Sequence, residues 1–188
     1  MKTLLTFPKL SVRRLATIGI LLALSYLLGR LSITIIPKQL VFSFTFILES
    51  IIGSITGPLL GFLTLGIFDL IDTLFSEKAG MFLIGWTVME AIMGFIYGAF
   101  FYGRSFSWSS KKDWFYVSLA MTVITILGSF IMTPWLIQHY YHVPIMAQFI
   151  AGRWIKIVEI PIRILVAMTV FPQLNRIPEY RKLLNPQN

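Results

Sequence analysis

Long apolar runs, separated by short polar or glycine-rich breaks, dominate the chain between residues 13 and 172. A helix needs about 20 mostly apolar residues to cross the hydrocarbon core of a bilayer. The pattern predicts an all-α integral membrane protein with six transmembrane helices, over residues 13–35, 40–56, 58–76, 80–102, 114–138 and 148–172. The second run is the weakest, because Glu49 and several Ser and Thr residues interrupt it, so five spans are the alternative.

The first run begins after Arg13 and Arg14, as the apolar region of a signal peptide begins after basic residues. It ends at Arg30 without a small-residue cleavage site, and similar runs follow it to the end of the chain. We therefore expect this segment to stay in the protein as its first transmembrane helix.

The composition supports a membrane protein of one domain. Hydrophobic residues make up 56% of the 188 residues and charged residues only 13%, about half the charged fraction of a soluble domain. Residues 1–188 show no internal repeat and no linker, so one transmembrane domain is expected. The absence of cysteine excludes disulfides, thiolate metal sites and a cysteine nucleophile.

Basic residues predict the orientation of the chain. They form three groups, before the first run, between the fourth and fifth runs, and after the last run: Lys2, Lys9, Arg13 and Arg14; Arg104, Lys111 and Lys112; Arg176, Arg181 and Lys182. By the positive-inside rule all three groups are cytoplasmic, which leaves Arg30, Lys38 and Lys78 outside. Both termini are then cytoplasmic in a multi-pass protein of the cell membrane. The net charge of +8 follows from this topology and from anionic lipid, so no nucleic-acid partner is expected.

Several charged residues fall within or at the edges of the apolar runs, where an unpaired charge costs several kcal/mol. They are Glu49, Asp69, Asp72, Glu90, Arg153, Lys156, Glu159 and Arg163. Any one of them could be neutralised by an ion pair or reach the interface with its side chain. Together they indicate a polar cavity inside the helix bundle.

Four of these charges follow a three-three-four spacing in the last run, at Arg153, Lys156, Glu159 and Arg163. On an α-helix this spacing places them on one face. The preceding segment 134–144 reads as a loop rich in aromatic residues. Cations beside Trp135 and Tyr140 suit a planar anionic ligand, although an interfacial aromatic belt would also explain these two residues.

The chain carries no recognisable catalytic or metal-binding motif. His139 and His142 form H-x-x-H without a third ligand nearby, so no metal site is predicted. The H-E-x-x-H, G-x-S-x-G and G-x-x-x-x-G-K-[ST] motifs are absent, and no catalytic residue is assigned. Transport would therefore need an ion gradient or a partner that hydrolyses ATP.

Small residues line one face of the first run at Ala16, Gly19 and Ala23. Such a face lets another helix approach closely. It could receive a partner subunit, or it could pack against other helices of the same chain.

Short motifs follow one another in a fixed order along most of the chain. They are Gly19-x-x-x-Ala23, Leu28-Gly29-Arg30-Leu31-Ser32-Ile33, Phe44-Thr45-Phe46, Gly53-x-x-x-Gly57-Pro58-x-x-Gly61, Asp69, Gly85-Trp86-Thr87, Gly94-Phe95-Ile96-Tyr97-Gly98, Thr133-Pro134-Trp135-Leu136, and Arg153-x-x-Lys156 with Pro161. This series resembles the substrate-binding S components of energy-coupling factor (ECF) vitamin transporters, most closely their folate-specific branch.

The resemblance implies a transport subunit without enzymatic activity or cofactor. Such a subunit binds a vitamin from outside, docks on a transmembrane scaffold with two ATPase subunits, and topples to release its cargo. Folate is the expected vitamin. Gly29, Met132 and Ile157 depart from the folate-specific pattern, so pantothenate or a thiamin-precursor pyrimidine is the alternative. More distant alternatives are an ion-coupled carrier and an intramembrane enzyme.

The expected binding site lies near the outer surface. It comprises the cations Arg30, Arg153 and Lys156, the aromatic residues Phe44, Phe46, Trp135 and Tyr140, and the polar residues Asp69 and Thr87. The cations would hold the carboxylates of a folate-like anion, and Asp69 would accept hydrogen bonds from its amino-substituted ring. Ala16, Gly19 and Ala23 would form the face that docks on the scaffold.

Overall fold

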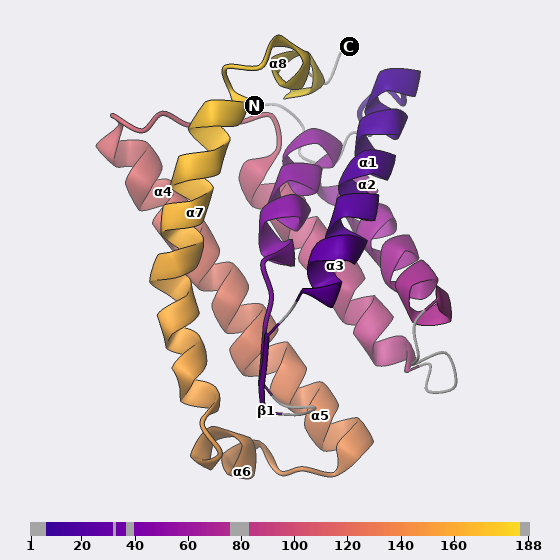
Figure 1. Ribbon diagram of the computed structural model, residues 1–188, viewed down its shortest axis with the longest axis vertical. Coiled ribbons are helices and arrows are strands. Elements are labelled where there is room, and N and C mark those ends of the chain that lie inside the picture. Colours follow the sequence, from indigo (N-terminus) through magenta and orange to yellow (C-terminus); the bar gives the residue numbers. More distant parts are fainter. Residues whose placement is uncertain (1–6, 32, 37–39, 76–82, 185–188) are drawn as a thin grey trace.

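The computed structural model describes residues 7–31, 33–36, 40–75 and 83–184 (Figure 1). Its elements are α1 (Val12–Arg30), β1 (Ile33–Ile36), β2 (Leu40–Phe42), α2 (Thr45–Phe75), α3 (Ile84–Phe101), α4 (Lys111–Thr125), the π-helix η1 (Ile126–Met132), α5 (Thr133–Tyr141), α6 (Ile145–Ile150), the 3₁₀-helix η2 (Arg153–Val158), α7 (Glu159–Leu174) and α8 (Pro178–Leu184). Lys38 and Lys78, expected in outer loops, lie outside the described residues.

Four helical segments in this part of the chain are long and apolar enough to cross a membrane. They are Val12–Arg30, Thr45–Phe75, Ile84–Phe101 and Lys111–Tyr141. The fourth runs through α4, η1 and α5 without a break, so it begins three residues before the predicted fifth helix and ends three residues after it. The predominantly helical, membrane-spanning character of the chain is confirmed.

A short antiparallel hairpin lies between α1 and α2. It replaces the predicted end of the first helix and the predicted start of the second. Strand β1 pairs with β2, with Ile33 opposite Phe42 and Thr34 opposite Val41. The predicted helix end at residue 35 and helix start at residue 40 are therefore wrong. β-Branched residues crowd a helix but suit a strand, and residues 33–36 are all β-branched.

Helix α2 is bent at Gly57, where the predicted second and third helices meet. Gly57 has φ 74° and ψ −178°, a conformation that a side chain would strain, and Pro58 follows it. The predicted break is thus confirmed, although the helix before it begins at Thr45 rather than residue 40.

The last predicted helix, 148–172, is divided into three parts. The short helix α6 ends at Ile150, Gly152 adopts a left-handed conformation with φ 113°, and η2 precedes α7. Pro161 lies in the first turn of α7, a part of a helix that tolerates proline.

Glycines bring α2 and α3 into backbone contact. A Cβ atom added at Gly94 would lie 2.3 Å from the carbonyl oxygen of Gly61, and one added at Gly98 would lie 2.4 Å from that of Gly57. At Gly53 the added atom would lie 2.7 Å from the backbone of Tyr97. Such close packing is a main source of helix association in membranes, where lipid competes for apolar contacts.

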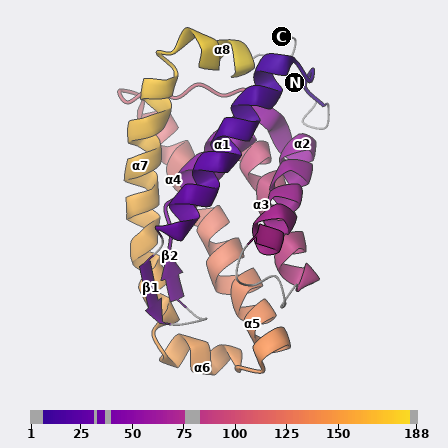
Figure 2. The same cartoon turned by 45° about the vertical axis from the view of Figure 1, so that its right-hand side comes forward.

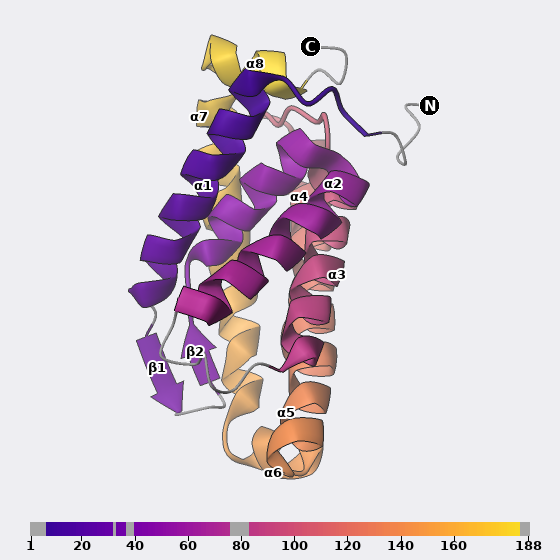
Figure 3. The ribbon, with the colours of Figure 1, turned by 90° about the vertical axis from the view of Figure 1, so that its right-hand side faces the viewer.

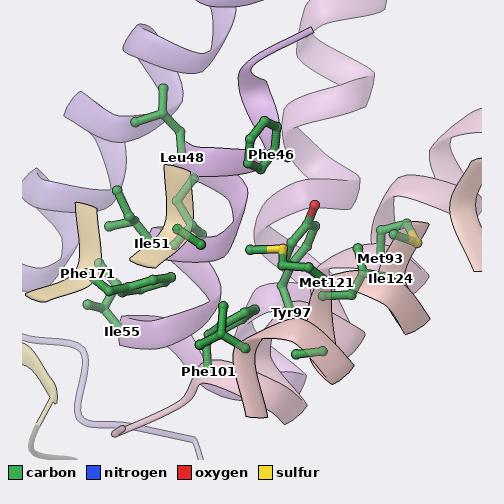
Figure 4. Packing of buried hydrophobic residues seen from close by; sticks show 14 of the residues in the cluster. Phe46, Leu48, Ile51, Ile55, Met93, Tyr97, Phe101, Met121, Ile124 and Phe171 are labelled. Carbon is green, nitrogen blue, oxygen red and sulfur yellow. The ribbon is translucent and has the colours of Figure 1, made fainter. Parts of the chain in front are cut away.

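Aromatic rings fill the interior between α3 and α7 (Figure 4). The rings of Phe101 and Phe171 stack with their centroids 5.1 Å apart, and Phe106 packs edge-on against Phe101 at 5.8 Å. Ile52 and Ile55 on α2 are fully buried in the same cluster.

The bundle has two distinct ends. Helix α8 and the start of α1 lie at one end, called the α8 end below, and α6 lies at the other, called the α6 end (Figures 1 and 2). The hairpin and the end of α1 also face the α6 end. Residues far apart in the sequence, on η2, α5 and the hairpin, are therefore at one end of the molecule.

The glycine contact predicts a large difference between two Gly→Ala variants. Gly98→Ala should destabilise the folded protein by about 1–3 kcal/mol, because the backbone of Gly57 cannot move away from the new methyl group. Gly19→Ala is the control, since an added Cβ there meets no atom within 4 Å. Thermal unfolding in detergent measures both variants, and equal midpoints would contradict the packing described here.

Candidate ligand-binding site

Two of the predicted cations are buried near the α6 end. Arg153 and Lys156, on η2, are 2% and 9% exposed. Arg153 donates a hydrogen bond from Nη1 to the Ser129 carbonyl oxygen at 3.0 Å. Lys156 forms an ion pair with Glu159, which also pairs with Arg163 at 3.1 Å.

The predicted charged face exists, although half of it is not α-helical. Arg153 and Lys156 belong to the 3₁₀-helix η2, whereas Glu159 and Arg163 belong to α7. Residues three apart eclipse each other on a 3₁₀-helix, so Arg153, Lys156 and Glu159 still lie on one side. The prediction of a shared face is therefore confirmed, whereas the prediction of one continuous α-helix is wrong.

Arg163 connects this face to the middle of the bundle. Its guanidinium lies 4.7 Å from the centre of the Phe46 ring, a cation–π contact. Arg163 is also within electrostatic reach of Glu49, and the Glu49 carboxylate accepts hydrogen bonds from Thr45 and Tyr97. Phe46, 2% exposed, is therefore held between a charged group and the core.

Asp69 and Thr87, two predicted site residues from different helices, contact each other. The Thr87 hydroxyl donates a hydrogen bond to Asp69 Oδ2 at 2.5 Å. Glu90, one turn further along α3, interacts electrostatically with Asp69, Asp72 and Glu49. Acidic groups thus extend from the Asp69–Thr87 pair toward the Arg163 end of the charged face.

The π-helical turn η1 supplies the carbonyl that holds Arg153. A π-helix shifts the backbone hydrogen bonds by one residue, and such turns are frequent at functional sites. Here the backbone N–H and the hydroxyl of Thr133 both reach the Gly128 carbonyl, the hydroxyl at 2.7 Å. The next carbonyl, that of Ser129, accepts from Arg153.

The aromatic segment 134–144 is mostly helical, so the predicted loop is wrong. Pro134 lies at the start of α5, which continues from η1 to Tyr141. Tyr140 points inward, and its hydroxyl accepts a hydrogen bond from the Gly85 backbone N–H at 3.0 Å. Trp135 is 60% exposed and stacks on His139 at 5.7 Å, so it is not gathered with the buried site residues.

The remaining predicted site residues lie closer to the surface. Arg30, the last residue of α1, is exposed and donates a hydrogen bond to the Tyr26 hydroxyl at 2.9 Å. Phe44 is 39% exposed, and its ring centre lies 6.5 Å from that of Phe46. Arg30 precedes the hairpin in the chain and Phe44 follows it, and neither residue is part of the buried interior.

No group of three potential metal ligands occurs among the residues that the structure describes. His139 is helical, and His142 ends α5 in a left-handed conformation with φ 56°. The His139 ring packs against aromatic rings, and its centre lies 4.9 Å from that of Tyr140.

Two charges of the last predicted helix were not assigned to the expected site but contact residues that were. Glu159 pairs with Lys156, and Arg163 lies over the Phe46 ring. Ion pairs among these charges were allowed for from the sequence, and their spacing was the available signal. Tyr97 was noted as part of a motif but not assigned to the site. Ser129 was missed, because a backbone carbonyl carries no pattern in the sequence.

The small residues of α1 lie on the outside of the bundle. Ala16, Gly19 and Ala23 are all exposed, and Gly19 has open space beside it. Among the four long apolar segments, α1 has the smallest buried share. The described helices of the same chain do not cover this face.

These features define a helical membrane protein with a buried charged site at one end and an open small-residue face on its first helix. A family model for "ECF transporter, substrate-specific component" matches residues 13–174. The chain belongs to this family, so it is a transport component and not an enzyme.

Relatives and a solved structure agree with this assignment. The chain is 55% identical to the folate transporter FolT of Streptococcus mutans over 185 residues, 98% of this chain and 99% of that protein. It is 29% identical to the folate transporter FolT of Leuconostoc mesenteroides over 163 residues, 84% of each chain. A crystal structure of FolT bound with folic acid matches with a TM-score of 0.74 and 28% identity, over 87% of this chain and 95% of the other.

Proposed function

We propose that this chain is the folate-binding subunit of an ECF transporter. The observation that carries the proposal is its 55% identity, over nearly its whole length, to a protein named as a folate transporter. The match to a structure of FolT with folic acid supports the same ligand.

The buried groups suit the two chemically different ends of folate. Its carboxylates need cations with little access to water, which Arg153 and Lys156 offer near the α6 end. Its amino-substituted ring needs a hydrogen-bond acceptor, which Asp69 provides beside Thr87. Phe46, against Arg163, and Tyr140, against Gly85, would supply apolar faces to the ligand. Arg30, Phe44 and Trp135 are exposed and would meet it from the surface.

Substitutions of the residues proposed for the two ends of folate should weaken its binding for different reasons. Arg153→Ala removes a buried partner of the ligand carboxylates, so we expect folate to bind at least roughly thirtyfold more weakly. Asp69→Asn should also weaken folate binding, because the amide that replaces the carboxylate has one acceptor oxygen and a donor NH₂ group. Titration calorimetry of the purified protein with folate, pantothenate and the thiamin-precursor pyrimidine measures both effects, with Arg176→Ala, exposed at the α8 end, as the control.

The outcomes separate the candidate ligands. Tight binding of another vitamin, with no binding of folate by the parent protein, would reject the folate assignment. Folate binding that is unchanged in both variants would reject the proposed site while leaving the ligand in place.

We propose that the chain crosses the membrane six times with both termini in the cytoplasm. If the two arms of α2 on either side of Gly57 each cross the membrane, they make six crossings together with α1, α3, the α4–α5 segment and α7. The start of α1 and helix α8 lie at the same end of the bundle, as an even number of crossings requires (Figure 3). Exposed Arg104, Lys111 and Lys112 favour the cytoplasmic side for the loop before α4.

Cysteine labelling tests this orientation cleanly, because the chain has no cysteine of its own. A thiol reagent that cannot cross the membrane should label His142→Cys from outside intact cells. Ser109→Cys should be labelled only after the membrane is opened. The reverse pattern would contradict the proposed orientation.

We propose that the exposed face of Ala16, Gly19 and Ala23 docks on the transmembrane scaffold of the transporter, whose two ATPase subunits supply the energy. The chain has no phosphate-binding loop of its own. Small residues allow close approach without polar contacts that would resist release.

Gly19→Trp should abolish folate uptake but leave folate binding nearly unchanged, because the indole would hold a partner helix away from the face. Leu24→Trp is the matched control, since Leu24 is also exposed but lies about 100° around the helix from Ala23. Uptake by the reconstituted transporter and titration of the isolated subunit measure the two effects. Equal losses of binding and uptake in Gly19→Trp would contradict docking at this face.

A further inference from the structure

Arg14 is completely buried, although it lies in the first turns of a helix that is mostly exposed. Its neighbour Arg13 is exposed, whereas Arg14 is 0% exposed. Its Nη2 atom donates to the Leu183 carbonyl oxygen at 3.0 Å, and its Nη1 atom donates to the Lys9 carbonyl oxygen. A buried cation is costly unless its hydrogen bonds are satisfied, so these carbonyls hold the guanidinium in place.

Helix α8 carries the carbonyl that Arg14 reaches. Leu183 is in the last turn of α8, where backbone carbonyls lack partners within the helix. Basic side chains commonly satisfy such groups. Here the donor comes from α1, 169 positions earlier in the sequence.

A second contact joins α8 to α2. The hydroxyls of Tyr180 and Ser54 are 2.7 Å apart, and both residues are buried. Burial raises the pKa of Tyr180, and its hydrogen bond with Ser54 opposes this rise in part, so the hydroxyl keeps its proton at neutral pH. Ser54 also accepts a backbone hydrogen bond from Gly103 at 3.1 Å, next to the bend at Gly57. We call Arg14, Ser54, Tyr180 and Leu183 the C-terminal clamp.

The clamp lies next to the exposed face of α1. In Figure 3, α8 lies over the end of α1 where that helix begins. Ala16 follows Arg14 by two positions but is exposed, so the two side chains leave α1 in different directions. The other buried residues of α1 are Ile18 and Ser25, and Leu21, Leu22 and Leu28 pack against the core while only partly buried.

We propose that the C-terminal clamp fixes the tilt of α1 and so positions the Ala16–Gly19–Ala23 face for docking. Arg14 acts as a positioning residue, because it touches neither the ligand site nor the outward face. This inference rests on the docking role proposed above for that face. It assigns to α8 a function in coupling rather than in ligand binding.

The central test compares Arg14→Met with Arg13→Met. Methionine keeps an unbranched apolar chain but removes the donors to Leu183 and Lys9. In the full transporter reconstituted in liposomes, we expect Arg14→Met to reduce folate uptake at least about tenfold, while the affinity of the isolated subunit for folate changes less than about threefold. Arg13→Met, altered at an exposed position, should match the parent protein in both measurements.

Removal of α8 provides an independent variant. A stop codon at position 178 should lower uptake at least as much as Arg14→Met does, because it removes both the Leu183 carbonyl and the Tyr180 hydroxyl. The double variant should be no worse than the truncation alone, because Arg14 then has no α8 contact left to lose. Tyr180→Phe removes only the hydroxyl next to Ser54 and should lower uptake by a smaller factor. It keeps the proposal testable if the other two variants do not fold. Normal uptake in the variants that fold would overturn the proposal.

A distance measurement separates the clamp from the docking face. Spin labels at Leu24→Cys on α1 and Leu165→Cys on α7, both exposed, should give one narrow distance distribution in the isolated protein. Arg14→Met should broaden or shift it, and Arg13→Met should not. An unchanged distribution in Arg14→Met, or an equal loss of folate affinity and uptake, would overturn the clamp. Normal uptake by Gly19→Trp would instead reject the docking face, whatever the spin labels show.

Discussion

The backbone contact between α2 and α3 sets the positions of the other helices and of the polar groups they carry. In a membrane, lipid satisfies apolar side chains as well as protein does, so helices associate where their surfaces fit most closely. Gly57 and Gly61 face Gly98 and Gly94 with no room for a methyl group. Continued toward the α6 end, the same antiparallel register places Asp69 opposite Thr87. The glycines thus determine which polar groups meet.

Charge neutralisation is the second constraint, and it operates along a chain of partners. Lys156 pairs with Glu159, Glu159 pairs with Arg163, and Arg163 lies near Glu49. Each buried charge would be costly alone, and each is held by a partner of opposite sign. These partners therefore hold the charged side chains in fixed positions within the bundle.

The first helix is held differently from the others. Helices α2, α3, α4 and α7 share a continuous apolar and aromatic core, whereas α1 contributes few buried residues to it. Its open face and its attachment through Arg14 suit a helix that meets a partner. Under the proposed function, ligand binding would belong to the helices of the core and docking to the exposed face of α1.

Features that depend on composition and local spacing could be predicted from the sequence. Apolar runs predicted most of the helices, because bilayer thickness sets their length. Gly57 and Pro58 predicted the bend, and the spacing of Arg153, Lys156 and Glu159 predicted a shared face. Other features depend on how distant segments pack. The Asp69–Thr87 pair, the support of Arg153 by a π-helical carbonyl and the burial of Arg14 under α8 depend on helix register and on contacts between distant segments. No local pattern encodes them, since a residue's partner across the bundle is set by how closely the intervening backbones can approach.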